Sequence, residues 1–197
     1  MNLDANDIKN DEMGMGFFTP NYYQKPVLYF YGMTTPGKSL DEHAPLDSIS
    51  FIRNEHHQFE IATAPPWLHA KYSKLDYDLF YLTVKSITTE SLEVIVNETS
   101  GQTAIVDRSA GKLVYWPDFL LGVHSVEFLP QSEAKVLVKP LPHASAVNTT
   151  FEFMRPLKIQ GTWMQVALWN ENFESVGRGW IQWSRNQILQ ISYSMLS

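Results

Sequence analysis

The sequence predicts an all-β protein whose antiparallel strands fall into two successive halves. Short runs of β-branched, aromatic and other apolar residues recur along the chain, and polar or Gly-containing turns separate many of them at intervals of roughly 8–12 residues. No long window combines the apolar spacing of an amphipathic helix with a capping box ahead of it. With 44% hydrophobic and 18% charged residues, the chain has enough apolar material for a packed core.

The first half contains a series of strand-like runs, each ended by turn-forming residues. They occupy residues 27–31, 49–53, 59–63, 79–84, 92–96 and 103–107. The last three are separated by Thr88-Thr89-Glu90 and by residues 97–101, which carry the polar and Gly residues that close hairpins. This half therefore reads as antiparallel β structure.

A second series follows a short helical turn predicted at residues 115–121, where Pro117 suits the first turn of a helix. These runs occupy residues 122–128, 136–139, 150–153, 157–160, 163–168, 179–183 and 188–193. Alternation in Met164-Gln165-Val166 indicates a strand with one face on a core and one in water. The polar stretch at residues 129–134 is the predicted domain boundary.

Two motifs in the C-terminal part carry a family resemblance. The run Gly161-Thr162-Trp163-Met164-Gln165-Val166 and the run Gly179-Trp180-Ile181 resemble a bacterial SH3-like domain, in which a Gly-x-Trp-x-x-Val strand and a Gly-Trp-Ile strand close a small barrel of five or six strands. Glycine at the first position of each motif permits a sharp reversal or a close backbone approach. The resemblance covers residues 134–197.

The N-terminal half looks like a divergent copy of the same domain. Leu92-Glu93-Val94 would correspond to Met164-Gln165-Val166, with Ser91 in place of Trp163 and Ala104 in place of Trp180. Residues 32–67 would be a long insertion. The resemblance, shared with uncharacterised proteins of the Bacteroidetes lineage, implies two SH3-like barrels packed together: an acidic flexible tail at 1–20, a divergent barrel at 21–130 and a second barrel at 131–197.

Charge and hydropathy exclude several classes of partner. A net charge of −6 without a Lys/Arg cluster argues against nucleic acid binding. No run approaches the ~20 apolar residues needed to span a bilayer. The opening residues carry four acids and one lysine rather than an export signal, so we expect a cytoplasmic chain as written, and a periplasmic or surface one if a leader has been removed.

The chemistry of the sequence predicts no catalysis, metal or cofactor. Cysteine is absent, and neither a Gly-x-Ser-x-Gly elbow nor a His-Glu-x-x-His motif is present. The adjacent pair His56-His57 is expected on the surface. Asp76-Tyr77-Asp78 would place two acids on one face of an extended segment, which leaves a hydrolase as the least favoured alternative.

Aromatic residues are the remaining candidates for a binding site. Trp67, Tyr72 and Tyr77 follow a Pro-Pro pair, Trp169 lies at an expected hairpin tip, and Trp180 lies in the Gly-Trp-Ile strand. Such rings line peptide and sugar grooves, although they also fill the cores of small barrels. The resemblance implies a noncatalytic module that binds a protein segment or cell-wall peptide or glycan. The alternative is a structural component of an oligomer, built through aromatic patches.

Overall fold

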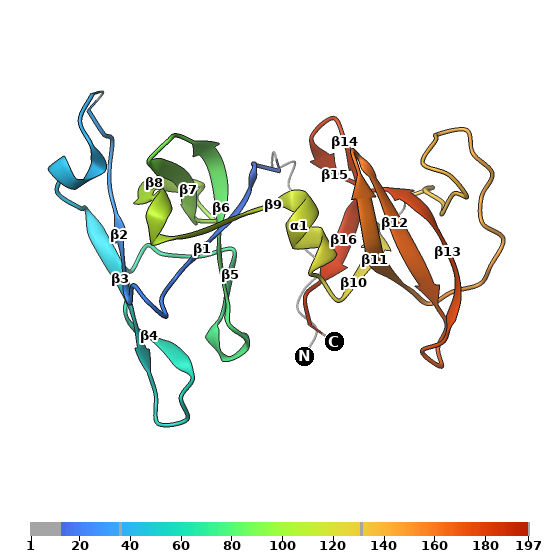
Figure 1. Cartoon of the computed structure of the whole chain (residues 1–197), viewed down its shortest axis with the longest axis horizontal. Helices are drawn as coiled ribbons and strands as arrows, with labels where there is room; N and C mark the ends of the chain where they lie inside the picture. The colour runs from blue at the N-terminus through green and yellow to red at the C-terminus, as the bar shows by residue number, and fades with distance from the viewer. Residues whose placement is uncertain (1–12, 36, 131, 197) are drawn as a thin grey trace. The chain divides into compact units, whose positions relative to one another are not determined.

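The structure is a computed structural model that describes residues 13–35, 37–130 and 132–196 (Figure 1). Strands account for 49% of the chain, and a single α-helix is present among the described residues, which confirms the all-β prediction. The chain divides into an N-terminal unit, Gly14–Trp116, and a C-terminal unit that begins at Pro117. The strand within residues 122–128 therefore belongs to the C-terminal unit, whereas sequence analysis assigned it to the first domain.

The main sheet of the N-terminal unit is entirely antiparallel. Its strands, in the spatial order β8-β7-β6-β1-β9, are β8 (Gln102–Asp107), β7 (Ser91–Asn97), β6 (Leu79–Ile87), β1 (Gly16–Pro20) and β9 (Gly111–Tyr115). A short strand, β5 (Tyr72–Lys74), also pairs with β6. The predicted tail is wrong over Gly16–Pro20, because this segment forms the buried strand β1; residues 1–12 lie outside the described part.

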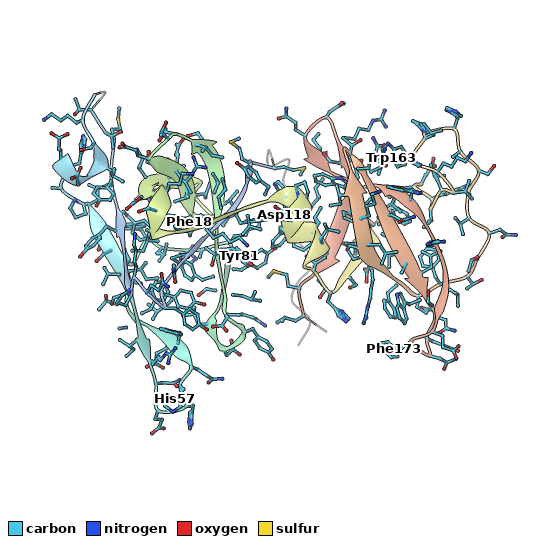
Figure 2. All side chains as sticks on the ribbon, viewed as in Figure 1. Phe18, His57, Tyr81, Asp118, Trp163 and Phe173 are labelled. Carbon is cyan, nitrogen blue, oxygen red and sulfur yellow. The ribbon has the colours of Figure 1, made fainter. Side chains whose placement is uncertain are left out.

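The connection from β1 to β6 forms a second sheet. It consists of β2 (Val27–Phe30), β3 (Asp47–Arg53) and β4 (Phe59–Thr63), with the 3-10 turns η1 (Leu40–Glu42) and η2 (Leu75–Tyr77) alongside. Tyr31, just after β2, exchanges two backbone hydrogen bonds with Ile105 of β8, at 2.8 and 2.9 Å. Both sheets bury one continuous core, in which Phe18 and Phe80 are fully inaccessible to solvent (Figure 2 labels Phe18).

The C-terminal unit begins within the helix α1 (Trp116–Leu121), which lies close to the predicted position. Its five-stranded sheet has the order β13 (Ser175–Gln182), β12 (Trp163–Trp169), β11 (Phe153–Gln160), β10 (Ser125–Phe128) and β16 (Ile191–Ser194). A small hairpin of β14 (Ser184–Arg185) and β15 (Ile188–Leu189) precedes β16. The ring of Phe119 in α1 meets that of Tyr193 edge-on, at 5.2 Å between centroids, so the helix is fixed against β16.

The two main sheets share one topology. Leaving out the short strand β5, each sheet has five strands, and numbered by their order in the chain they lie in the spatial order fourth, third, second, first, fifth. Both second strands also carry a bulge at the corresponding place, between Val84 and Ser86 in β6 and between Pro156 and Lys158 in β11. A shared strand order and a shared bulge indicate that the two halves are copies of one structural unit.

The structure corrects the expected alignment of these copies by one residue. Glu93 pairs with Ile105, and the equivalent Gln165 pairs with Trp180, so Ile105 rather than Ala104 occupies the position of Trp180. Ala104 instead corresponds to Gly179, and both residues are buried. The one-residue error matters because it would place these side chains on the opposite face of the sheet.

The described strands form open sheets, so the expected closed barrels are not confirmed. In each unit the connection between the first two strands pairs with the fourth strand instead: Tyr31 pairs with Ile105 and Leu137 with Trp180. The expected strand at residues 136–139 is reduced to single bridges at Leu137, to Trp180 and to Ala146. The expected strand at 150–153 is largely absent, since β11 begins only at Phe153.

Candidate functional site

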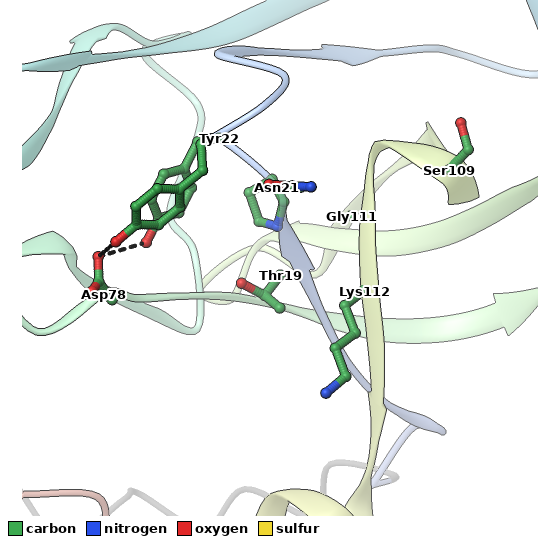
Figure 3. A pocket seen from close by; sticks show the side chains of 9 residues that line it. Thr19, Asn21, Tyr22, Asp78, Ser109, Gly111 and Lys112 are labelled. Carbon is green, nitrogen blue, oxygen red and sulfur yellow. Dashed lines mark hydrogen bonds between the residues drawn. The ribbon is translucent and has the colours of Figure 1, made fainter.

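A pocket of about 330 Å³ lies in the N-terminal unit, where β1 ends and β9 begins (Figure 3). Its walls come from the end of β1 and the turn after it, from the residue before β6, from the 3-10 turn η3 (Arg108–Ala110), and from the start of β9. The lining residues are Thr19, Pro20, Asn21, Tyr22, Tyr23, Asp78, Ser109, Gly111 and Lys112. We call this cavity the tyrosine pocket.

Backbone contacts fix the end of β1 against the start of β9, and both of these segments line the tyrosine pocket. Pro20 pairs with Gly111 at the end of the β1–β9 ladder, and because proline lacks an N–H the strand stops there. The next amide, that of Asn21, donates to the carbonyl oxygen of Ala110 at 2.9 Å. A Cβ atom on Gly111 would lie 2.2 Å from the carbonyl oxygen of Thr19, so only glycine permits this close approach.

Two tyrosines and an aspartate form the polar side of the pocket. The rings of Tyr22 and Tyr23 stack with centroids 5.3 Å apart. Tyr23 donates its hydroxyl hydrogen to Oδ1 of Asp78 at 2.7 Å, and Tyr22 approaches the same oxygen at 3.5 Å (dashed lines in Figure 3). Asp78 follows η2 with a φ of 56°, a left-handed conformation that aspartate tolerates better than most residues. This turn aims its carboxylate at both phenols.

The surroundings keep both phenols protonated. Burial raises the pKa of Tyr22 above its ordinary value near 10, and the negative charge of Asp78 raises it further. The hydrogen bond to Asp78 is the main cause of the raised pKa of the exposed Tyr23. At neutral pH the two hydroxyl groups therefore act as hydrogen-bond donors to the carboxylate.

Aromatic rings from β3 and β4 pack against the two tyrosines. The Tyr22 ring lies 4.9 Å from that of Phe51 and 4.8 Å from that of Phe59, and the Tyr23 ring lies 4.6 Å from that of Phe59. The guanidinium carbon of Arg53 sits 5.0 Å from the Phe59 ring centre and 5.6 Å from that of Tyr23. The cation and the rings restrict the movement of Tyr23 even though 56% of that residue is exposed.

The opposite wall carries a small hydrogen-bond network and a free cation. The Ser109 hydroxyl donates to Oδ2 of Asp107 at 2.8 Å and accepts from Nζ of Lys25 at 3.1 Å. Lys112 is exposed, and in the described part of the chain neither it nor Asp78 forms an ion pair. The pocket thus offers one carboxylate and one ammonium group on separate walls, with the exposed ring of Tyr23 beside the carboxylate.

Replacing Tyr22 with phenylalanine should make the free energy of unfolding fall less steeply as pH rises through the alkaline range. Because the folded state holds the Tyr22 proton more tightly than the unfolded chain does, the free energy of unfolding should fall as pH rises above about 10. Urea unfolding followed by circular dichroism between about pH 8 and pH 11 measures this slope. A Tyr22→Phe variant with a wild-type slope would contradict the assignment.

Three of the predicted ligand-binding aromatics lie in the N-terminal unit, and none lines the tyrosine pocket. Trp67 is partly buried against the core, with its ring edge-on to Phe30 at 5.4 Å. Tyr72, in β5, contacts the rings of Phe17 and Tyr81, each at 6.3 Å. Tyr77 is 58% exposed and has Nζ of Lys74 5.9 Å from its ring centre.

The other two candidates lie in the C-terminal unit. Trp169, at the end of β12, stacks parallel to Phe153 and has the guanidinium group of Arg155 over its ring. Trp180, in β13, is partly buried and exchanges backbone hydrogen bonds with Leu137. The five predicted aromatics are therefore not brought together at one site.

Sequence reasoning missed Tyr22 and Tyr23 and gave Asp78 a different role. The signal for the tyrosines was an Asn-Tyr-Tyr turn directly after an apolar run that ends in proline. The expectation that Asp76 and Asp78 share one face of an extended segment is wrong, because Asp76 lies in the 3-10 turn η2 and Asp78 caps it in a left-handed conformation.

The histidine pair lies in the turn between β3 and β4, as expected for surface residues, and Figure 2 labels His57 at this tip. Residues 13–35, 37–130 and 132–196 contain no group of three His, Asp or Glu side chains able to hold a metal ion. Their helices include none that is long and apolar enough to cross a membrane. Comparisons with protein-family models, curated proteins and solved structures find no match to this chain.

Proposed function

We propose that this chain is a tandem SH3-like binding module that recognises an extended polypeptide segment without catalysing a reaction, and that the tyrosine pocket is its docking point. The observation that carries the proposal is the exposed, hydrogen-bonded Tyr23–Asp78 pair on a rigid aromatic base. Flat aromatic surfaces with fixed polar groups are typical of grooves that bind extended peptides.

The duplicated topology supports the SH3-like assignment. In each unit the last strand returns to pair with the first strand: β9 with β1, and β16 with β10. In the C-terminal unit the two motifs that resemble the family occupy adjacent strands, since Trp163 begins β12 and Trp180 lies in β13. A common order of five strands in both units supports the duplication of one small β domain.

The charges of the pocket support a segment with a basic residue. Asp78 is exposed, and its Oδ1 atom already accepts from Tyr23, so its second oxygen is available to a lysine or arginine side chain. The exposed ring of Tyr23 would receive an adjacent proline or aliphatic side chain. Lys112 on the opposite wall would donate a hydrogen bond to a backbone carbonyl or to an acidic side chain of the same segment.

A peptide screen followed by titration of the tyrosine variant tests this proposal. Peptides from an array that bind the wild-type protein would be titrated by fluorescence, and Tyr23→Ala should weaken binding by about tenfold or more. Asp78→Asn should weaken it mainly for peptides with a basic residue. Tyr77→Ala is the matched control, because it removes a neighbouring exposed ring that does not line the pocket.

Three results would contradict the proposal: equal losses in Tyr23→Ala and Tyr77→Ala, no binding peptide in the screen, or turnover of a substrate that a single substitution abolishes. Binding to purified peptidoglycan that Tyr23→Ala weakens would keep the pocket and replace the protein segment with a cell-wall peptide or glycan.

A second candidate, an assembly component, is favoured by the outward face of the β2–β3–β4 sheet. Tyr29 and Ile52 project from this face, and each is 48% exposed. Large apolar side chains exposed on one sheet face are common at protein interfaces. Light scattering tests this candidate: a concentration-dependent oligomer that Ile52→Lys disrupts would support it, and a monomer at all concentrations would exclude self-assembly.

A further inference from the structure

The strand β4 lies at one edge of the β2–β3–β4 sheet (Figure 1), and no strand in the described part of the chain pairs with its outer side. Residues 60–63 of this strand are all exposed. The outer sides of two other strands are covered, since β8 exchanges hydrogen bonds with Tyr31 and β13 with Leu137. The 3-10 turn η2 lies near β4, but among the described residues no backbone hydrogen bond joins the two. The outer side of β4 is therefore open to another strand.

The hydrogen bonds of β3 show which backbone groups of β4 point outward. Phe51 in β3 donates its amide hydrogen to the carbonyl oxygen of Pro26 at 2.8 Å, so its backbone groups point toward the β2 side. Residues opposite each other in an antiparallel pair point either toward or away from one another, so Ile61, opposite Phe51, points away from β3. Phe59 also points away, because these directions alternate along a strand. The N–H and C=O groups of Phe59 and Ile61 thus form an unpaired row that an extended backbone would satisfy.

The charge of Glu60 argues against a second copy of this chain as the occupant. If two copies of β4 paired antiparallel through their outward groups, each Phe59 would lie opposite the other copy's Ile61, and Glu60 would lie opposite Glu60. Like charges directly opposite on neighbouring strands destabilise the pairing. Glu60 is exposed, and within the described ranges its carboxylate forms no ion pair, so it is available to a cation of a different polypeptide.

We propose that the outer side of β4 binds an extended segment of another polypeptide, which adds a strand to the sheet and places a lysine or arginine opposite Glu60. This basic side chain projects from the same face of the sheet as Glu60. Its two neighbours project from the other face, beside Phe59 and Ile61, and apolar side chains suit that face because Ile61 is 38% exposed. No residue of β4 lines the tyrosine pocket, so this site does not depend on the function proposed for that pocket.

Nuclear magnetic resonance of the full ¹⁵N-labelled chain tests this site. The probe is acetyl-Ser-Val-Lys-Val-Ser-amide, and acetyl-Ser-Val-Glu-Val-Ser-amide is the comparison peptide because it changes only the central charge. We expect saturable shifts of the Phe59 and Ile61 amide signals with the lysine peptide, and about fivefold weaker binding of the glutamate peptide. Absence of a shift at Ile61 overturns the proposal. Equal affinity for the two peptides, or a dimer in light scattering that Ile61→Pro abolishes, overturns the choice of occupant.

Substitutions in β4 separate backbone pairing from simple attraction between charges. Ile61→Pro removes an outward N–H and leaves the pairing of Glu60 with Ile52 in place, so it should weaken binding of the lysine peptide by about tenfold or more. Ile61→Val keeps the N–H and should retain wild-type affinity. Glu60→Lys should reverse the preference, so that the glutamate peptide binds more tightly than the lysine peptide. Glu90→Lys, at an exposed glutamate outside β4, is the matched control and should keep the wild-type preference. Equal effects of Glu60→Lys and Glu90→Lys overturn the proposal.

Discussion

Phe18→Ala should lower the free energy of unfolding by about 3–5 kcal/mol, the largest effect expected in the N-terminal unit. Phe18 is completely buried in β1, an interior strand between β6 and β9, where it pairs with Leu82 on one side and Leu113 on the other. Truncation removes the ring from the core and leaves a cavity that two flanking strands prevent from collapsing. Because domains are stable by only about 5–15 kcal/mol, this loss is a large share of the total stability.

Chemical denaturation of Phe18→Ala beside Met33→Ala measures this effect. Met33 is 99% exposed, so its truncation should change the free energy of unfolding by less than about 0.5 kcal/mol. A Phe18→Ala loss no greater than that of Met33→Ala would show that β1 is not in the core.

Gly179→Ala should be the most damaging small substitution in the C-terminal unit, at about 1–3 kcal/mol. A Cβ atom there would lie 2.3 Å from Cγ1 of Val136 and 2.9 Å from the carbonyl oxygen of Leu137. Val136 is only 4% exposed, so its methyl group has little room to move away. The added carbon should therefore push the 136–138 segment off β13 and break the hydrogen bonds between Leu137 and Trp180.

Gly177→Ala in the same strand is the control for this prediction. The nearest atom to its new Cβ, Cδ1 of Leu168, would be 3.7 Å away, which is an ordinary contact. We expect unchanged or slightly higher stability, because alanine loses less backbone entropy than glycine on folding. Hydrogen exchange at the Leu137 and Trp180 amides should accelerate only in Gly179→Ala; equal exchange in both variants would contradict the proposed clash.

Local sequence patterns predicted most strands of both units. The strand β4 occupies the predicted residues 59–63, and β7 (Ser91–Asn97) extends the predicted 92–96 by one residue at each end. The helix Trp116–Leu121 falls within the predicted 115–121. The residues of each of these elements are enough to predict it, because hydrophobic alternation and turn residues act within a few positions of each other.

The strand β1 could not be recognised in this way. Its five residues are almost all buried, so it lacks alternation, and it follows directly on an acidic segment. Its position in the sheet is set by pairing with strands that are distant in the sequence: Gly16 lies opposite Val84 on one side and Tyr115 on the other. Conversely, residues 136–139 have a strand pattern but make only single bridges, at Leu137.

The candidate sites depended even more on tertiary contacts. Tyr23 and Asp78 are 55 positions apart and meet only because η2 turns the carboxylate toward the end of β1. Composition indicated that aromatic residues would matter, but it did not distinguish Trp67, packed against the core, from Tyr23, exposed at a pocket.

The amino-acid sequence by itself determined that this chain is a β protein with two successive sets of strands, because strand periodicity and turn chemistry are local properties. Tertiary structure decided the shared strand order, the open sheets, and the meeting of Tyr23 with Asp78 and of Arg155 with Trp169. Those features depend on pairing and packing between distant segments, and no pattern within a short window encodes the partner of a strand.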